Sequence, residues 1–448
     1  MSEAKRRIPF MIKVHANFNK SIGKIKPMHA INNMPTVPND WNGTLFGKLR
    51  EANVPYSRLH DTGGYFGGAH YVDIPNIFPC FDADENDPES YDFAFTDALL
   101  SEICANGIKP YYRLGVSIEN HQYIKPYHIF PPRDYEKWAR ICEHVILHYN
   151  EGWANGFHMG IEYWEIWNEP DNQPDVKDNV MWKGSMEDYF RLYEVTARYL
   201  KQKFPQLKFG GYGSCGFYAI NSVDVSQIAN SSSRTEYFIE FFVKFVEYIR
   251  SRKLPLDFFS WHSYAGIKDM VDFAKFPRKA LDEAGYTDCE IHLNEWNPSF
   301  HLRGKAEDAA NVMANMIAMQ NSPVDMLMYY DSNVMSPYCG IFDPVGGGVF
   351  KTYYSFYIFG QLYSLGEQVR CVADSGDVYA LAAKGEQGAA IVLANLSDAE
   401  QEISLSIDGT SIENARIFAV DESCEFCEVA GDVGSMRICA KGIKFIKL

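Results

Sequence analysis

The sequence predicts a (β/α)8 TIM barrel followed by a small antiparallel β-sandwich. Two observations support this fold class. Short apolar runs alternate with amphipathic stretches along most of the chain, and after residue 365 the pattern changes to short alternating segments separated by Gly, Asp and Ser. We expect the barrel over residues 26–365 and the sandwich over 366–448. An open doubly wound sheet is the alternative, but no GxGxxG or Walker-type loop follows the first run.

Eight apolar runs are expected to form the strands of the barrel. They are KPMHAINN from Lys26, PYSRLHD from Pro55, KPYYRLG from Lys109, YWEIWNEPD from Tyr163, KFGGYG from Lys208, DFFSWHSY from Asp257, EIHLNEWN from Glu290 and DMLMYYDS from Asp325. Parallel strands need crossover connections, and helical patterns occupy the intervals.

Three of these helical patterns are clear. Ser185, with Asp188 placed for a capping box, opens one that continues through apolar residues to Leu200. A second covers residues 237–249, and a third covers 305–320. The helix-like YYSFYIFGQLYSLG then closes the barrel region.

The C-terminal segments include VYALAA, GAAIVLAN, EISLSI and RICAKGIKFIKL, which alternate as strands of a sandwich do. FMIKVHANF from Phe10 alternates in the same way but precedes the barrel. We therefore expect a strand within residues 8–20 to complete the sandwich.

Composition limits the partners. The chain has 448 residues, 46% of them hydrophobic, so it can bury a large core, and its net charge of −16 disfavours nucleic acid and anionic membranes. No apolar stretch of signal-peptide or membrane-spanning length follows the basic N-terminus, so a cytoplasmic protein is expected. A homo-oligomer is compatible with the sequence.

Cys424 and Cys427 form a CxxC motif. Its spacing suits half of a zinc site or a redox pair, and no second such motif accompanies it.

Polar residues end several of the predicted strands. In a parallel barrel the active site lies where strands end, and there the sequence has Arg58 to Asp61, Glu169, His262 with Tyr264, Glu295 and Asp331. Their convergence predicts a site at the mouth of the barrel.

Two acids share the fourth run. Glu165 and Glu169 would lie on one face, but Glu165 is about 13 Å further down an extended strand. We expect it to be buried inside the barrel and paired with a base such as Arg113. Pro170 cannot continue the ladder, so we expect the strand to end at Glu169 and leave its carboxylate at the mouth.

Two carboxylates at a barrel mouth suit glycosidic cleavage without a cofactor. One, with a raised pKa, would protonate the leaving oxygen while the other attacks the anomeric carbon. Tryptophans near both acids, Trp164, Trp167 and Trp296, suit either sugar stacking or the core. Metal binding is the other use of paired carboxylates, but no HxH or HExxH motif supports it, and we expect no metal.

The residues resemble a known family. WNEPD around Glu169 and NEW around Glu295 are similar to clan A of the glycoside hydrolases. FNKSIGKIKPMHAINNMP from Phe18, SRLHD from Ser57 and DIPNIFP from Asp73 narrow the resemblance to glycoside hydrolase family 39, which includes β-xylosidases and α-L-iduronidases. The resemblance covers the barrel nearly end to end and extends to the sandwich.

The resemblance implies roles for individual residues. Glu169 would be the acid/base and Glu295 the nucleophile, with Asn168 on the sugar 2-hydroxyl and Tyr264 on the nucleophile. The remaining residues are expected to bind substrate or support the nucleophile, and they are Arg58, His60, His262, Trp296 and Tyr330. The eighth strand has Tyr329, Tyr330 and Asp331 where many clan members have a tryptophan, and the glycine-rich DTGGYFGGAH from Asp61 would cover the site or form a surface turn.

The function expected from this resemblance is that of a retaining, exo-acting glycosidase, β-xylosidase-like, on short β-linked oligosaccharides or glycosides. Three alternatives remain: an endo-acting glycanase, a catalytically silent carbohydrate-binding barrel, and a metal-dependent hydrolase. A closed pocket favours exo action and an open cleft favours endo action. Sensitivity to chelators would favour the metal-dependent hydrolase.

Overall fold

A closed parallel barrel and a nine-stranded sheet make up the protein. The computed structural model describes residues 11–35, 44–62, 72–118, 127–222 and 233–448. Within these residues the barrel strands follow one another in chain order. They are β2 (Ala30–Asn32), β3 (Tyr56–Leu59), β4 (Lys109–Leu114), β5 (Tyr163–Ile166), β6 (Lys208–Ser214), β7 (Phe258–Ser263), β8 (Glu290–Trp296) and β9 (Met326–Tyr329). The barrel is confirmed, and each strand falls in a predicted run.

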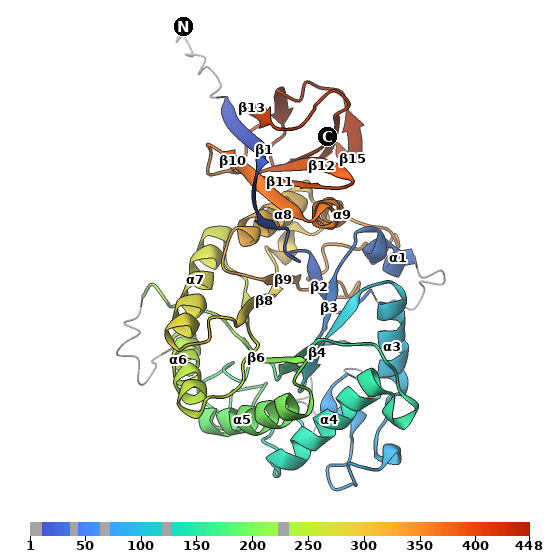
Figure 1. Ribbon diagram of the computed structural model, residues 1–448, viewed down its shortest axis with the longest axis vertical. Coiled ribbons are helices and arrows are strands. Elements are labelled where there is room, and N and C mark those ends of the chain that lie inside the picture. Colours follow the sequence, from blue (N-terminus) through green and yellow to red (C-terminus); the bar gives the residue numbers. More distant parts are fainter. Residues whose placement is uncertain (1–10, 36–43, 63–71, 119–126, 223–232) are drawn as a thin grey trace.

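Helices surround the barrel (Figure 1). They are α1 (Thr44–Glu51), α2 (Ile74–Ile77), α3 (Ala94–Ala105), α4 (Tyr135–Glu151), α5 (Met186–Lys203), α6 (Arg234–Arg252), α7 (Ile267–Glu283), α8 (Ala306–Gln320) and α9 (Lys351–Leu365). The predicted capping box is present at α5, where the Ser185 hydroxyl accepts from the Asp188 N–H and the Asp188 carboxylate accepts from the Ser185 N–H. It satisfies amide groups that the first turn leaves unpaired.

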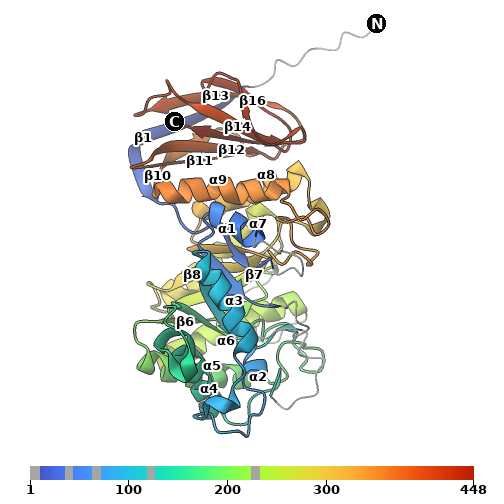
Figure 2. The ribbon, with the colours of Figure 1, turned by 90° about the vertical axis from the view of Figure 1, so that its right-hand side faces the viewer.

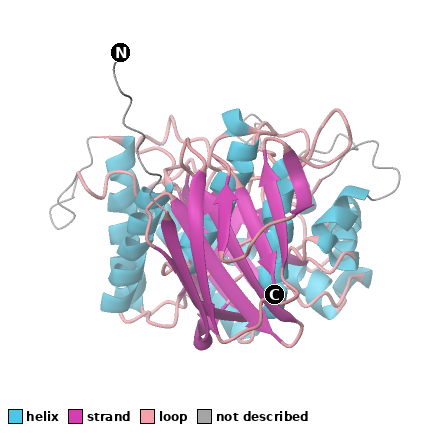
Figure 3. Cartoon of the chain, turned by 90° about the horizontal axis from the view of Figure 1, so that it is seen from above, coloured by secondary structure: helices cyan, strands magenta, loops and turns pink. Residues whose placement is uncertain are grey.

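The second sheet joins the two ends of the chain. Its strands are β1 (Ile12–Lys24), β10 (Glu367–Ala373), β11 (Val378–Gly385), β12 (Gly388–Asn395), β13 (Gln401–Asp408), β14 (Arg416–Asp421), β15 (Cys424–Val429), β16 (Ser435–Ile438) and β17 (Ile443–Lys447). The order is β15-β14-β17-β12-β11-β10-β1-β13-β16 in the described residues. Figure 3, seen from above, shows strands lying side by side in front of the helices. β1 lies between β10 and β13, and it pairs parallel with β13, a pairing that the expected antiparallel arrangement did not include.

The two faces of this sheet have different neighbours. On one face, Ile391 and Leu393 of β12 belong to an apolar core made by residues of this sheet alone. On the other face, Val392 and Ala394 belong to the core that the sheet shares with the barrel. The helices α8 and α9 separate sheet and barrel (Figure 2). The expected domain boundary at residues 365 and 366 falls between α9 and β10.

Cys424 and Cys427 are joined as a disulfide in β15. Both of these cysteines therefore have a covalent partner within the same strand.

Candidate active site

Glu169 lies in a turn after β5, not at the end of the strand. β5 ends at Ile166, and the backbone then takes left-handed φ values of 77° at Trp167 and 47° at Glu169. The Glu169 N–H donates to the Gly213 carbonyl, 3.0 Å away. The prediction that Pro170 ends the strand at Glu169 is therefore wrong, because the chain leaves the ladder three residues earlier. The carboxylate still reaches the mouth of the barrel.

Glu295 reaches the same place through a bulge in β8. The register with β7 pairs Trp261 with Leu293 and then His262 with Glu295, so β8 contains one extra residue here. A bulge breaks the alternation of side chains. Asn294, which donates to Glu165 at 2.6 Å, and Glu295 consequently both face the barrel interior.

The same bulge turns Trp296 away from the site. Trp296 is fully buried, and its ring meets Tyr329 edge-on at 5.5 Å in the core. A sugar-stacking role for Trp296 is therefore not supported. Trp164 and Trp167 are also buried core residues. Of the two roles that the sequence left open for them, sugar stacking and core packing, the structure therefore supports core packing.

His262 connects the two carboxylates. Its Nδ1 lies 2.8 Å from Glu169 Oε1 and 3.6 Å from Glu295 Oε2. One ligand atom of each of these three residues lies within 4.8 Å of the others. Glu295 and His262 are buried, and Glu169 is partly exposed. The two predicted acids therefore lie at close range, on either side of His262.

Glu169 and His262 shift each other's pKa. Burial alone would raise the pKa of Glu169, but the hydrogen bond and the charge of His262 outweigh it and lower the pKa. Burial opposes the charge on His262, but Glu295 and Glu169 together raise its pKa. The lowered pKa of Glu169 differs from the raised pKa expected for the acid.

Glu295 accepts two further contacts. The Tyr264 hydroxyl donates to Oε1 at 2.7 Å, and Arg58 Nη1 lies 3.4 Å from Oε2. Removal of the Tyr264 hydroxyl from solvent, together with the Glu295 carboxylate, raises the pKa of Tyr264 well above the usual phenol value. Tyr264 therefore stays protonated and can donate to an ionised Glu295.

Arg58 organises the floor of the site. Its Nε donates to Glu165 Oε2 at 2.7 Å, and its Nη2 donates to Asn168 Oδ1 at 2.5 Å. The buried Glu165 is thus paired as expected, but with Arg58. Arg113 contacts Asp73 instead, so the predicted Glu165–Arg113 pair is wrong.

His60, Asp61 and Tyr330 form a chain beside the carboxylates. The Tyr330 hydroxyl donates to Asp61 Oδ2 at 3.0 Å, and His60 Nε2 lies 3.3 Å from the same oxygen. Burial raises the pKa of Asp331 to about 7, and its Oδ2 accepts from Asn33 at 3.3 Å. The glycine-rich segment that follows Thr62 lies outside the described residues.

Several contacts were not anticipated. Asn172 donates to Glu169 Oε2 at 2.8 Å, and Asn32 Oδ1 accepts from Arg58 at 3.2 Å. Asp171, held by the Ser214 hydroxyl at 2.9 Å, lies close enough to Glu169 that burial and that neighbour raise its pKa to about 7. The sequence contained one indication of these contacts, since Asp171 and Asn172 follow Glu169 within three residues.

The site has ligand atoms for a metal ion as well as for a sugar. Within the described ranges, Glu169, His262 and Glu295 are the group whose spacing could hold one.

No helix in the described part of the chain is long and apolar enough to cross a membrane.

Comparison with known proteins identifies the family. The model of glycosyl hydrolases family 39 matches residues 70–339. A beta-xylosidase of Geobacillus stearothermophilus is 24% identical over 273 residues, which are 54% of this chain and 48% of that protein. A beta-xylosidase of Caldicellulosiruptor saccharolyticus is 23% identical over 364 residues, 74% of this chain and 65% of that protein. The chain thus spans about half to two thirds of the length of these relatives.

Solved structures share the fold. A glucosidase from Croceicoccus marinus has a TM-score of 0.75 at 20% identity, covering 98% of this chain and 99% of that one. A beta-xylosidase from Caulobacter crescentus has a TM-score of 0.65 at 16% identity, covering 97% and 99%. The family model covers more than half of the sequence and agrees with the resemblance found in its motifs. The chain therefore belongs to family 39 of the glycosyl hydrolases, the family of glycosidases that the sequence predicted.

Proposed function

We propose that this protein is a retaining glycosidase in which Glu295 is the nucleophile and Glu169 the acid/base. The short separation between the two carboxylates, with oxygen atoms within 4.8 Å, is the observation that carries the proposal. Retaining enzymes hold their carboxyl groups about 5–5.5 Å apart, whereas inverting enzymes leave about 6.5–9.5 Å for a water. The arrangement favours direct attack on the sugar.

In the first step Glu295 attacks the anomeric carbon and the glycosidic bond breaks. The proton held between His262 Nδ1 and Glu169 Oε1, which are 2.8 Å apart, passes through Glu169 to the leaving oxygen. Tyr264 donates to Glu295 and Arg58 lies beside it, so both orient the carboxylate for the attack. In the second step Glu169 takes a proton from water, and the resulting hydroxide releases the sugar with its original configuration.

The substrate class we propose is a short β-linked oligosaccharide or glycoside with a neutral sugar, and a β-xyloside first. Two curated relatives are beta-xylosidases. Asp61 lies beside the carboxylates, where its negative charge would disfavour an anionic sugar. Exo action is part of the proposal. It predicts xylose and xylopentaose as the first products from xylohexaose, whereas endo cleavage would give fragments of two to four units.

The metal-dependent alternative has one observation in its favour, the ligand spacing of Glu169, His262 and Glu295. It predicts that a chelator abolishes activity and that a divalent ion restores it. The double-displacement proposal predicts full activity in the presence of the chelator.

Replacement of Glu169 by Ala tests the acid/base assignment. An aryl xyloside with a good leaving group needs little protonation, so Glu169→Ala should form the glycosyl-enzyme and then hydrolyse it slowly. Azide should restore turnover and give the β-xylosyl azide, because a small anion needs no general base. The exposed Asp272→Asn on α7 is the matched control. If Glu169→Ala hydrolysed unactivated xylosides as fast as the wild type, the assignment would be rejected. If the wild type bound sugars but hydrolysed none of them, the catalytically silent carbohydrate-binding barrel would be favoured.

A further inference from the structure

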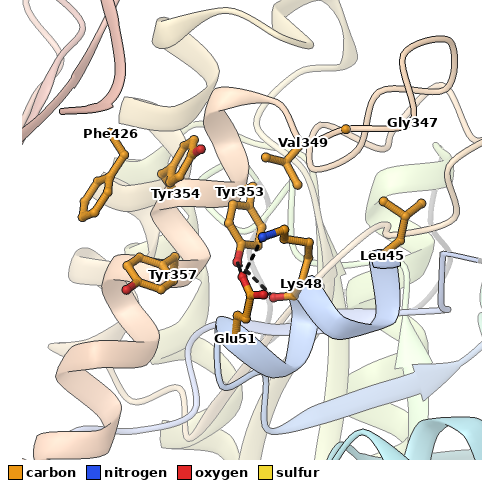
Figure 4. Close-up of a pocket in the computed structure, with 10 residues that line it drawn as sticks. Leu45, Lys48, Glu51, Gly347, Val349, Tyr353, Tyr354, Tyr357 and Phe426 are labelled. Carbon is orange, nitrogen blue, oxygen red and sulfur yellow. Dashed lines mark hydrogen bonds and ion pairs between the residues drawn. The ribbon is translucent and has the colours of Figure 1, made fainter. Parts of the chain in front are cut away.

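A second pocket lies on the side of the barrel, between α1, α9, the loop before α9 and strand β15 of the sheet (Figure 4). Its volume of about 380 Å³ lies within the range of small-molecule sites. None of its lining residues belongs to the active site described above.

One wall of the pocket is aromatic. Tyr354 and Phe426 are half-buried, and their rings stack with centroids 5.4 Å apart and planes 6° apart. Tyr357 meets Phe426 edge-on at 5.4 Å. Tyr354 comes from α9 and Phe426 from β15, so the wall exists only where barrel and sheet meet (Figure 4).

The opposite side carries hydrogen-bonding groups. Lys48 Nζ and Glu51 Oε2 form an ion pair of 2.7 Å, and their side chains remain 35% and 54% exposed. The Tyr353 hydroxyl donates to the Lys48 carbonyl at 3.1 Å and fixes this part of α1 against α9. The ion pair therefore offers both donors and acceptors to a ligand and adds no net charge.

We propose that this pocket is an accessory binding site for a neutral oligosaccharide, separate from the catalytic cavity. A sugar ring has an apolar C–H face and a hydroxyl rim. Tyr354 and Phe418 both stack on Phe426, so the half-buried Tyr354 ring is the part of the wall that suits the face, and the Lys48–Glu51 pair suits the rim. A polyanion would meet Glu51 and a chain of net charge −16. The concave shape fits a small ligand better than the flat surface of a second protein.

The test measures binding independently of hydrolysis. Xylotriose, cellotriose and mannotriose are titrated by calorimetry into the full chain carrying Glu295→Gln, which leaves the sugar intact. Two further changes are made separately in that protein. Tyr354→Ala removes the aromatic wall. Gly348→Trp adds a bulky side chain at the pocket lining without removing a contact, because a Cβ at Gly348 meets no atom within 4 Å. Phe95→Ala, an exposed aromatic of α3, is the matched control.

We expect at least one trisaccharide to bind at the pocket. Its affinity for this site should fall at least tenfold in both pocket variants and stay unchanged in Phe95→Ala. Hydrolysis of a small aryl xyloside by chains with Glu295 intact should be the same with and without these two changes. Superimposable isotherms for all four proteins, or no binding of any of the three sugars, would overturn the proposal. A concentration-dependent dimer that Gly348→Trp abolishes, without sugar binding, would assign the pocket to a second copy and also overturn it. Because binding is read without turnover, failure of the proposed function would leave this result intact.

Discussion

At the scale of single residues, the environment of Glu295 decides whether it can act as a nucleophile. It is buried, yet Tyr264 donates to one carboxylate oxygen at 2.7 Å and Arg58 lies 3.4 Å from the other. Hydrogen bonds to an ionised carboxylate favour its charged form, and both contacts have the geometry that such a stabilisation needs.

Tyr264→Phe removes one of these contacts. A hydrogen bond to a charged group contributes about 1.5–3 kcal/mol, so kcat/KM should fall about tenfold to a hundredfold. Steady-state kinetics on an aryl xyloside measure this change. Tyr338→Phe is the control, because its ring lies 5.8 Å from that of Tyr264 but no hydrogen bond from its hydroxyl is found among the described residues. Equal rates for Tyr264→Phe and the wild type would show that the contact is not needed.

Sequence alone placed the two acids at the same edge of the barrel, because each follows an apolar run that ends in polar residues. It misplaced Trp296, which was assigned to the site because it directly follows Glu295. Successive residues of a strand point to opposite faces, and the Trp296 ring packs against Tyr329 in the core. It also paired Glu165 with Arg113 instead of Arg58. The second error concerns which side chains meet across the barrel, and local patterns carry no such information. The roles assigned to the site residues remain predictions.

At the scale of elements, Arg58 joins strands that are distant in the sequence. From β3 it contacts Asn32 of β2, Glu165 of β5 and Glu295 of β8, and its side chain is fully buried. These contacts cross the interior of the barrel, so the ion pairs connect strands that share no ladder.

Arg58→Met should therefore destabilise the fold. It leaves Glu165 and Glu295 buried without their cation, which costs about 3–5 kcal/mol of unfolding free energy. Urea denaturation measures the loss of unfolding free energy. The double variant Arg58→Met with Glu165→Leu should recover part of it, because the buried Glu165 carboxylate that lacks a cation is then removed. Arg437→Met on β16 breaks exposed pairs and should cost less than about 1 kcal/mol. A similarly small cost for Arg58→Met would contradict this role.

The strands were more predictable than their pairings. Apolar runs between turn residues indicated each barrel strand, and the alternation near Phe10 indicated β1. That β1 lies parallel to β13 could not be predicted, because its partners come from the far end of the chain and pairing depends on contacts between them.

At the scale of the whole molecule, buried carboxyl groups make stability depend on pH. Asp308 of α8 is buried and accepts from the Thr352 hydroxyl of α9 at 2.6 Å. Burial raises its pKa to about 6 from an ordinary value of 3.8. In the unfolded chain it ionises near pH 4, so between about pH 4 and 6 folding takes up a proton, and the native state loses stability as the pH rises through this window.

Asp308→Asn should remove this dependence. The variant should gain stability relative to the wild type between pH 4 and 7 by up to about 3 kcal/mol, since a shift of about two pKa units corresponds to that amount. Unfolding by urea at several pH values gives the difference. Asp272→Asn, an exposed carboxylate on α7, should show no such trend. A constant difference between Asp308→Asn and the wild type across this range would refute the explanation.

The central claim is that Glu169 and Glu295 act on a sugar from both sides without a water between them. Product stereochemistry tests it most directly, by 1H NMR of the first sugar released from an aryl β-xyloside before mutarotation. We predict that β-xylose appears first and the α-anomer only later. If α-xylose appears first, the reaction is a single displacement by water, and the double displacement proposed for these two carboxylates is contradicted.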